Sequence, residues 1–346
     1  MAMLKMGIIG FGKMGEFHAS WMTPENQMQL TAICEKNPDR IVQIKEKYPN
    51  IHTYQNVGEF LKEDIDFAVI VTTHETHEEL TIKALNAGKN VIVEKPMSMT
   101  YASTKRMVSA AEKNRKHLFV HQSSRWDRDF LLLKEVIQSG KLGKLLCIES
   151  KVTMCDEGWP QWGIEGSANP WRIKAKYGGG MLYDWGPHLV DEALVLIGKD
   201  PLSIYGVLQK GVWSKEVDDY FFALMKFEDN LLFQIECGNN ARIAAPRWFV
   251  LGSQGTFVVH GKKEPVWADV EIDYQKPDGE KIHERIELVG VKESGIEGGF
   301  YRDLVPFLKG QKKDFVSMYE TSKVVKILEM IQESDKTNSV ISFDSK

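Results

Sequence analysis

Cysteine is scarce in this chain of 346 residues, and the four that occur are scattered with no C-x-x-C pair: Cys34, Cys147, Cys155 and Cys237. This usage argues against a disulfide framework or a zinc knuckle and is typical of a reducing compartment, so we expect a cytoplasmic protein. No apolar run approaches the roughly 18 residues that span a membrane. The short apolar start, Met6–Ile9, leads directly into glycines, which favours a first buried strand over a signal peptide.

The chain also lacks a large excess of charge of one sign. Its 44 Lys and Arg residues nearly balance 48 Asp and Glu residues, which gives a formal net charge of −4. This balance gives no reason to expect binding to nucleic acid or to an anionic membrane. The length predicts about two domains of roughly 150 residues each, enough for a sizeable core.

The first 121 residues alternate short apolar runs with polar-patterned segments. Apolar strands separated by helices are typical of a parallel sheet covered on both faces, so we expect a doubly wound parallel sheet. Gly88 precedes one strand at a position typical of the glycine that follows a helix end. The predicted strands are Met6–Ile9, Leu30–Cys34, Phe67–Val71, Val91–Val93 and Leu118–His121, and the predicted helices are Lys13–Met22, Pro38–Lys47, His77–Asn86 and Tyr101–Lys113.

After residue 140 the pattern changes to short β-rich segments separated by turns. We expect an α+β domain with one large, open, mainly antiparallel sheet, interrupted by a helix around His188 and a C-terminal helix over Gly299–Ser334. A long segment rich in Gly, Trp and Pro, residues 155–177, reads as a functional loop. The predicted strands are Leu145–Met154, Ser203–Lys210, Tyr220–Phe227, Leu231–Cys237, Arg247–Leu251, Thr256–His260, Ala268–Tyr274 and His283–Leu288.

The first candidate site is a glycine-rich turn between the first predicted strand and the first predicted helix. Its residues are Gly10, Phe11, Gly12, Lys13, Met14 and Gly15. Gly10 permits a tight turn, Gly12 lets backbone amides approach a pyrophosphate, and Gly15 lets the helix pack close to the strand. The helix N-terminus offers partial positive charge to the phosphates. In this context the motif predicts a dinucleotide site rather than a plain tight turn.

Glu35 ends the second predicted strand, in the position where a carboxylate can bind both ribose hydroxyls and repel a 2′-phosphate. That placement favours NAD over NADP as the cofactor. Lys36 and Arg40 lie close by and could pair with a phosphate, so NADP stays possible. The alternative for Glu35 is an ordinary solvated residue at a helix entry.

Two further segments follow strands at the carboxyl edge of the sheet, where ligands bind in such folds. Thr72, Thr73 and His77 come after one strand and are candidate cofactor contacts, although His77 could equally be a residue of a first helical turn. Glu94 and Lys95 come after the next strand. The Lys95 ammonium could hydrogen-bond a substrate hydroxyl, or only pair with Glu94 or a phosphate.

Asp184 and His188 are four residues apart, after Gly178-Gly179-Gly180, and Asp191 extends the same predicted helix face. Histidine suits a base that takes a hydroxyl proton as hydride leaves the same carbon. Asp184 could orient the imidazole or bind a neighbouring hydroxyl. The structural alternative is a satisfied core histidine beside a helix cap. Pro187 requires that the helix begin near Asp184 or bend there.

A zinc site is not expected, because His, Asp and Cys do not recur here at ligand spacing. Trp171 and Arg172, with the other tryptophans of the 155–177 loop, suit a sugar or polyol, since aromatic faces accept C–H faces and Arg binds hydroxyls. Arg125 follows the predicted strand Leu118–His121 and should border the same crevice. Domain packing is the alternative for each of these residues, and the favoured one for Trp126.

Together, Gly10–Gly15, the Glu94-Lys95-Pro96 triplet, and Gly178-Gly179-Gly180 with Asp184, His188 and Asp191 resemble the glucose–fructose oxidoreductase / inositol dehydrogenase / rhizopine-catabolism (Gfo/Idh/MocA) family over essentially the whole chain. The resemblance implies a Rossmann domain (residues 1–122), a substrate-binding and oligomerisation domain (residues 123–346), and a C-terminal helix that packs back on the first domain. It also implies a nicotinamide cofactor and a catalytic set of Lys95, Asp184 and His188. The family often has proline and asparagine where this chain has His74 and Glu75.

From these residues we expect an NAD(P)-dependent dehydrogenase of a sugar, inositol or related polyol. The resemblance also implies a homodimer or homotetramer formed through the C-terminal sheet. Two alternatives stay open. One is a glycosidase that uses tightly held NAD for a transient oxidation, and the other is a sugar or cofactor sensor without turnover.

Overall fold

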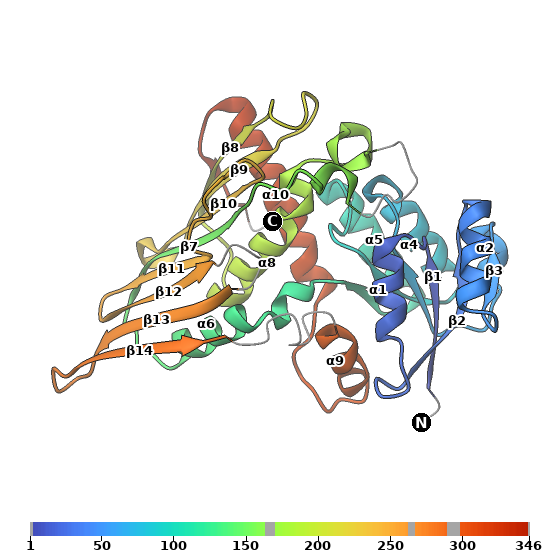
Figure 1. Cartoon of the computed structure of the whole chain (residues 1–346), viewed down its shortest axis with the longest axis horizontal. Helices are drawn as coiled ribbons and strands as arrows, with labels where there is room; N and C mark the ends of the chain where they lie inside the picture. The colour runs from blue at the N-terminus through green and yellow to red at the C-terminus, as the bar shows by residue number, and fades with distance from the viewer. Residues whose placement is uncertain (1–2, 163–169, 262–266, 289–297, 345–346) are drawn as a thin grey trace.

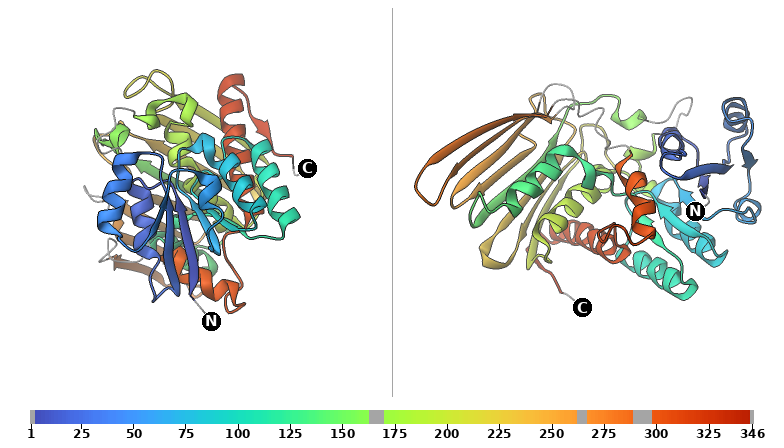
Figure 2. Two further views of the ribbon diagram at one scale, coloured as in Figure 1. Left: turned by 90° about the vertical axis from the view of Figure 1, so that its right-hand side faces the viewer. Right: turned by 90° about the horizontal axis from the view of Figure 1, so that it is seen from below.

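The N-terminal half forms a six-stranded parallel sheet in a computed structural model that describes residues 3–162, 170–261, 267–288 and 298–344. The strand order is β3-β2-β1-β4-β5-β6. Helices cover both faces of this sheet (Figure 2). The strands are β1 (Leu4–Ile9), β2 (Met28–Cys34), β3 (His52–Tyr54), β4 (Phe67–Ile70), β5 (Asn90–Val93) and β6 (Leu118–Val120), and the helices are α1 (Lys13–Trp21), α2 (Pro38–Lys47), α3 (Val57–Phe60), α4 (His77–Asn86) and α5 (Tyr101–Asn114).

The strand order reverses at β1, which pairs with β2 on one side and β4 on the other. Ligands of open α/β sheets bind beyond the carboxyl ends of the strands at such a reversal. The ends of β1, β4 and β5 therefore define where a cofactor site belongs. Gly88 follows α4 with a φ of +78°, which confirms the glycine predicted after that helix.

The C-terminal half contains a nine-stranded sheet in the order β14-β13-β12-β11-β7-β10-β9-β8-β15. All its neighbouring strands are antiparallel except β7 and β10, which are parallel. The expected fold class is thus confirmed. The strands are β7 (Leu145–Thr153), β8 (Ser203–Gln209), β9 (Tyr220–Lys226), β10 (Leu232–Gly238), β11 (Trp248–Gly252), β12 (Gly255–Gly261), β13 (Trp267–Gln275), β14 (Lys281–Glu287) and β15 (Ile341–Ser342).

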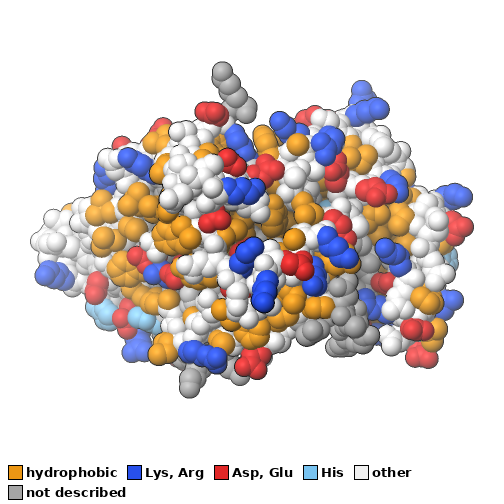
Figure 3. Space-filling model, turned by 90° about the horizontal axis from the view of Figure 1, so that it is seen from above, with side chains coloured by type: hydrophobic (Ala, Val, Ile, Leu, Met, Phe, Trp, Pro, Cys, Tyr) orange, Lys and Arg blue, Asp and Glu red, His pale blue; other side chains and the backbone are white. Residues whose placement is uncertain are grey.

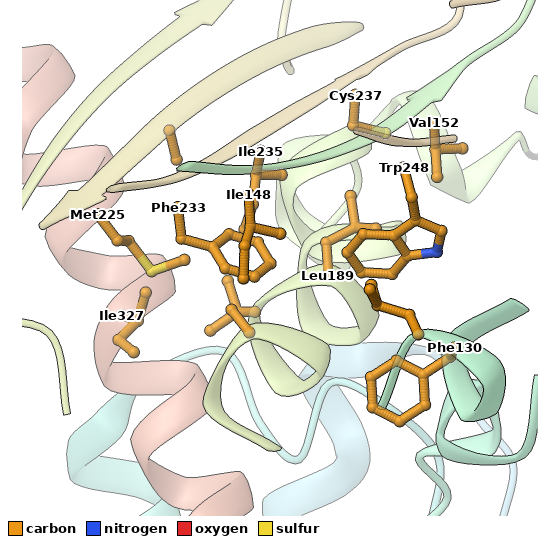
Figure 4. Close-up of a cluster of buried hydrophobic side chains, with 14 of the residues drawn as sticks. Phe130, Ile148, Val152, Leu189, Met225, Phe233, Ile235, Cys237, Trp248 and Ile327 are labelled. Carbon is orange, nitrogen blue, oxygen red and sulfur yellow. The ribbon is translucent and has the colours of Figure 1, made fainter. Parts of the chain in front are cut away.

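Helices cover one face of this large sheet, the face turned toward the Rossmann domain (Figure 1). They are α6 (Arg128–Gln138), α7 (Met181–Asp184), α8 (Gly186–Ile197) and α10 (Met318–Thr337). Figure 4 shows the core between them, in which side chains from the sheet point at side chains from the helices. Phe233 and Trp248 of the sheet, Phe130 of α6, Leu189 of α8 and Ile327 of α10 are all almost fully buried there.

The C-terminal helical region packs against the first domain. Phe300 and Tyr301 of α9 (Gly299–Leu308) share a buried cluster with Met6 and Ile8 of β1. Val325 of α10 joins the cluster on the other face of the Rossmann sheet. The division at residue 122 stays a prediction, although β6 ends at Val120 and the second sheet begins only at Leu145.

Several local expectations were wrong. The predicted helix over Gly299–Ser334 is two helices, because α9 ends at Leu308 and Gly310 then adopts a φ of +69°. The sequence reading also missed β3, α3, α6 and β15. Of these, α6 is 11 residues long and amphipathic, and it buries Phe130, Leu133 and Val136.

None of the helices in the described ranges is both long and apolar enough to cross a lipid bilayer. On the face shown in Figure 3, basic and acidic side chains are interspersed. That distribution agrees with the small net charge of the chain.

Candidate active site

The glycine-rich turn connects β1 to α1 and has the geometry that a dinucleotide requires. Gly10 has a φ of +88°, and a Cβ there would lie 2.3 Å from the carbonyl oxygen of Val71. A Cβ on Gly15 would lie 2.7 Å from the Gly10 carbonyl oxygen. Gly12 is the N-cap of α1 and supplies no capping side chain. The first amides of α1 thus have no side-chain cap, and they suit a phosphate group.

Glu35 is almost fully buried and joins this turn to the end of β2. Its two carboxylate oxygens accept hydrogen bonds from the backbone N–H groups of Phe11 and Asn37, each at 2.9 Å. The carboxylate therefore fixes the shape of the turn in addition to facing the cavity. This structural use was not apparent from the sequence.

A cavity of about 880 Å³ extends from the glycine turn to the end of α7. It brings together most of the residues predicted from separate motifs. Those that line it are Gly10, Phe11, Gly12, Lys13, Met14, Gly15, Glu35, Thr72, Thr73, Glu94, Lys95, Trp171, Arg172, Asp184 and His188. The residues present thus fit a dinucleotide at one end of the cavity and a small polar substrate at the other.

Two predicted site residues lie outside this cavity lining. His77 is fully buried at the start of α4, where its ring nitrogens lie 2.8 Å from the Pro96 carbonyl oxygen and 3.2 Å from that of Thr72. Burial lowers the pKa of His77, so the ring is neutral and only one nitrogen donates. His77 supports the cofactor-facing loops from behind and does not line the cavity.

Arg125 is the second correction. Its guanidinium donates to both carboxylate oxygens of Asp191, at 2.7 Å each, and to Glu320 at 3.0 Å. It lines a different, smaller cavity. The acidic partners raise the pKa of Arg125 despite the opposing effect of burial. Asp191, expected to continue a catalytic face, is committed to this ion pair.

Trp126 packs in the core and donates to Asp303 at 2.7 Å, as the packing alternative predicted.

Lys95 and Asp184 form the centre of the candidate catalytic site. The Lys95 ammonium lies 2.9 Å from Oδ1 of Asp184 and also bonds to its backbone carbonyl. Oδ2 of Asp184 accepts a hydrogen bond from the Trp159 indole at 2.8 Å and lies 3.6 Å from the Arg172 guanidinium. Burial raises the pKa of Asp184, but these cations and hydrogen bonds outweigh it and leave the pKa well below its ordinary value.

His188 does not share a continuous helix with Asp184. The helix is interrupted between α7 and α8. Pro187 occupies the first turn of α8, which is one of the two arrangements that the proline allows. Nδ1 of His188 is buried and has no hydrogen-bond partner in the part of the chain that the structure describes. Burial, followed by the charge of Lys95, lowers the pKa of His188 to about 3, so the ring is neutral. A neutral imidazole is the form that can accept a proton.

Several residues that line the cavity were not predicted as site residues, among them His74, His121 and Trp159. His74 is nearly fully buried, and its ring lies 2.8 Å from the Gly178 carbonyl oxygen, which ties the glycine approach of α7 to the Rossmann domain. His121 follows β6 at the carboxyl edge of the sheet. Lys95 was predicted because it follows a strand at this edge, and the same reasoning could have found His121. Trp159 was noted only as one of the loop tryptophans. Residues 163–169 of that loop lie outside the described residues.

His18, Glu94 and His121 are residue types that could hold a metal, and their donor atoms lie within 4.8 Å of one another. In the structure these groups bond to each other. Oε1 of Glu94 lies 2.8 Å from His18 and 2.7 Å from His121. Burial opposes ionisation of Glu94, yet the two histidines bring its pKa well below the ordinary value. Glu94 thus lies as a carboxylate between two imidazoles, while Nε2 of His121 is buried without a hydrogen-bond partner among the described residues.

With this geometry established, comparison with known proteins identifies the family. Residues 4–122 match the family described as "Oxidoreductase family, NAD-binding Rossmann fold", and residues 130–258 match the "GFO/IDH/MocA C-terminal domain". The chain belongs to the Gfo/Idh/MocA oxidoreductase family. Its N-terminal domain is therefore an NAD-binding domain, which confirms the resemblance and the cofactor class inferred from the glycine turn.

Individual relatives agree with this assignment. An uncharacterized oxidoreductase of Schizosaccharomyces pombe is 30% identical over 278 residues, which cover 75% of this chain and 72% of the relative. The scyllo-inositol 2-dehydrogenase (NADP(+)) IolW of Bacillus subtilis is 25% identical over 361 residues, covering 99% and 96%. The crystal structure of an NAD-binding protein from Listeria innocua superposes with a TM-score of 0.82 at 28% identity, covering 98% and 96%.

Proposed function

We propose that this oxidoreductase transfers a hydride between a nicotinamide cofactor and a secondary alcohol of an inositol, a sugar or a related polyol. One observation carries the proposal. The glycine turn that suits a pyrophosphate and the Lys95–Asp184–His188 group line the same cavity. The similarity to a scyllo-inositol dehydrogenase supports a polyol substrate. We propose NAD as the preferred cofactor because of Glu35, although Lys36 and Arg40 also line the cavity and leave NADP possible.

Bound nicotinamide would accept the hydride with its electron pair from the carbinol carbon. The chain's own residues handle the proton and the oxygen. Nδ1 of His188 is buried, so Nε2 is the nitrogen left to receive the hydroxyl proton. Among the described residues, two Asp184 oxygens hold the Lys95 ammonium, which leaves one N–H for the substrate oxygen. That N–H stabilises negative charge on the oxygen as the proton leaves.

The test is to follow reduced-nicotinamide absorbance with NAD or NADP and a panel of inositols, sugars and sugar acids. We expect steady growth with one polyol class, and His188→Ala should abolish it while NAD affinity changes less than about twofold. Turnover that survives His188→Ala would disprove the role of the base. NAD that co-purifies without net reduction, together with release of a chromogenic aglycone, would instead identify the redox-assisted glycosidase.

We also propose that the large sheet forms a homo-oligomer interface through the face opposite α6, α8 and α10. In Figure 1 the described helices lie on the other side of this sheet. Light scattering after size exclusion tests this interface. We expect a mass of at least twice the 39.4 kDa of one chain. A monomer at micromolar concentration would exclude the interface.

A further inference from the structure

The shortest side-chain contact to Oδ2 of Asp184 is the hydrogen bond from the Trp159 indole N–H, at 2.8 Å. Trp159 lies in the described part of the loop, ahead of residues 163–169. Its residue surface is only 4% exposed. Trp159 lines the cavity, but a ring buried to this degree exposes too little of its face for a sugar to stack on it.

Arg172 reinforces the same oxygen from the other end of the loop. Its Nε lies 3.6 Å from Oδ2 of Asp184, and its guanidinium lies 4.9 Å from the Trp162 ring and 4.5 Å from the Trp171 ring. It also donates to the Trp162 carbonyl oxygen. Two aromatic rings therefore restrict the guanidinium and keep it directed at the carboxylate.

Both oxygens of Asp184 are occupied by these contacts. Lys95 takes Oδ1, while Trp159 and Arg172 take Oδ2. Within the described residues, Asp184 has no hydrogen bond to His188, whose Nδ1 lacks a partner. Asp184 thus acts on Lys95 and does not orient the imidazole.

We propose that Trp159 is a positioning residue that holds the Asp184 carboxylate, with help from Arg172, so that Asp184 in turn holds the Lys95 ammonium against the substrate oxygen. This inference rests on the proposed dehydrogenase function and adds a residue to it. The Trp159 indole neither gives nor takes the proton or the hydride of the proposed reaction. Its effect passes through Asp184 to Lys95.

The first experiment compares Trp159→Phe, which keeps a ring but removes the N–H donor, with Trp213→Phe. Trp213 is a matched control because its indole donates to the Asn239 carbonyl oxygen at 2.6 Å and lies outside the cavity lining. We expect kcat to fall about 10- to 100-fold in Trp159→Phe, the range for one hydrogen bond to a charged group, with KM nearly unchanged. Trp213→Phe should stay within twofold of wild type.

The pH profile and a mutant cycle separate positioning from a general loss of structure. Without the indole donor the Asp184 carboxylate is less stabilised, so the acid limb of kcat should move to higher pH. In the Asp184→Asn background, Trp159→Phe should change kcat less than threefold, because the two residues act as one unit. Full additivity, or a wild-type kcat in Trp159→Phe, would overturn the proposal.

A measurement without turnover keeps this inference separate from the proposed function. The indole N–H signals of ¹⁵N-labelled protein can be assigned by the two Trp→Phe variants. In Asp184→Asn the Trp159 signal should move because its charged acceptor is lost, whereas the Trp213 signal should not. If no polyol supports turnover, the proposed function fails, and an unmoved Trp159 signal would independently overturn the positioning contact.

Discussion

Replacing Arg125 by methionine distinguishes a substrate-binding arginine, which the sequence suggested, from the ion pair that the structure contains. Asp191 is 2% exposed, and Arg125 donates to both of its oxygens at 2.7 Å. Methionine keeps an apolar stem but leaves the Asp191 carboxylate buried without its cation. Removing one partner of a buried pair costs about 3–5 kcal/mol. The contact to Glu320 adds little, since that side chain is 52% exposed.

The assay is denaturant unfolding followed by tryptophan fluorescence, at pH 8 and at pH 5. Burial already raises the pKa of Asp191, and loss of Arg125 raises it further. An acid with a raised folded pKa contributes stability below its unfolded pKa and loses it as pH rises through the folded value. The deficit of Arg125→Met should therefore be larger at pH 8 than at pH 5.

Two further variants act as controls. Adding Asp191→Asn to Arg125→Met removes the buried charge and should recover part of the lost stability. Lys199→Met breaks an exposed pair with Glu228 and should cost less than about 1 kcal/mol. An unchanged unfolding free energy in Arg125→Met, combined with a tenfold rise in the KM for substrate, would refute the ion-pair reasoning.

Three other predictions follow from single positions. Gly10→Ala forces a side chain onto a φ of +88° and to 2.3 Å from the Val71 carbonyl oxygen, so it should cost at least about 1–2 kcal/mol and weaken NAD binding in a fluorescence titration. Glu35→Gln removes the charge that repels a 2′-phosphate, and the ratio of NADP to NAD affinity should rise tenfold or more; an unchanged ratio would exclude Glu35 as the discriminator. Burial raises the pKa of Asp218 to about 7, so its ionisation destabilises the fold as pH rises through that value. Asp218→Asn, whose amide oxygen can still accept from the Leu182 N–H, should gain stability relative to wild type at pH 8 but not at pH 5 in thermal unfolding, and an equal effect at both would contradict the shift.

Local patterns were sufficient for the elements with a strong period or a clear end. The predicted helix at Pro38–Lys47 matches α2, which begins at its proline and has Asn37 as N-cap. The predicted strand Tyr220–Phe227 matches β9 to within one residue. Short elements such as β3 and α3 were missed because three or four residues carry no detectable period.

By itself, the sequence determined the two-domain class and the cofactor turn, because these depend on local hydrophobic periodicity and on glycines placed where the backbone geometry requires them. It also identified Lys95, Asp184 and His188 as candidates. The tertiary structure decided what each side chain contacts. Arg125 meets Asp191 across 66 residues, and Trp159 meets Asp184 across 25. Such contacts depend on how α6, α8 and the loop pack over the large sheet. Spacing along the chain contains no record of that packing, so both the error at Arg125 and the role of Trp159 emerged only in three dimensions.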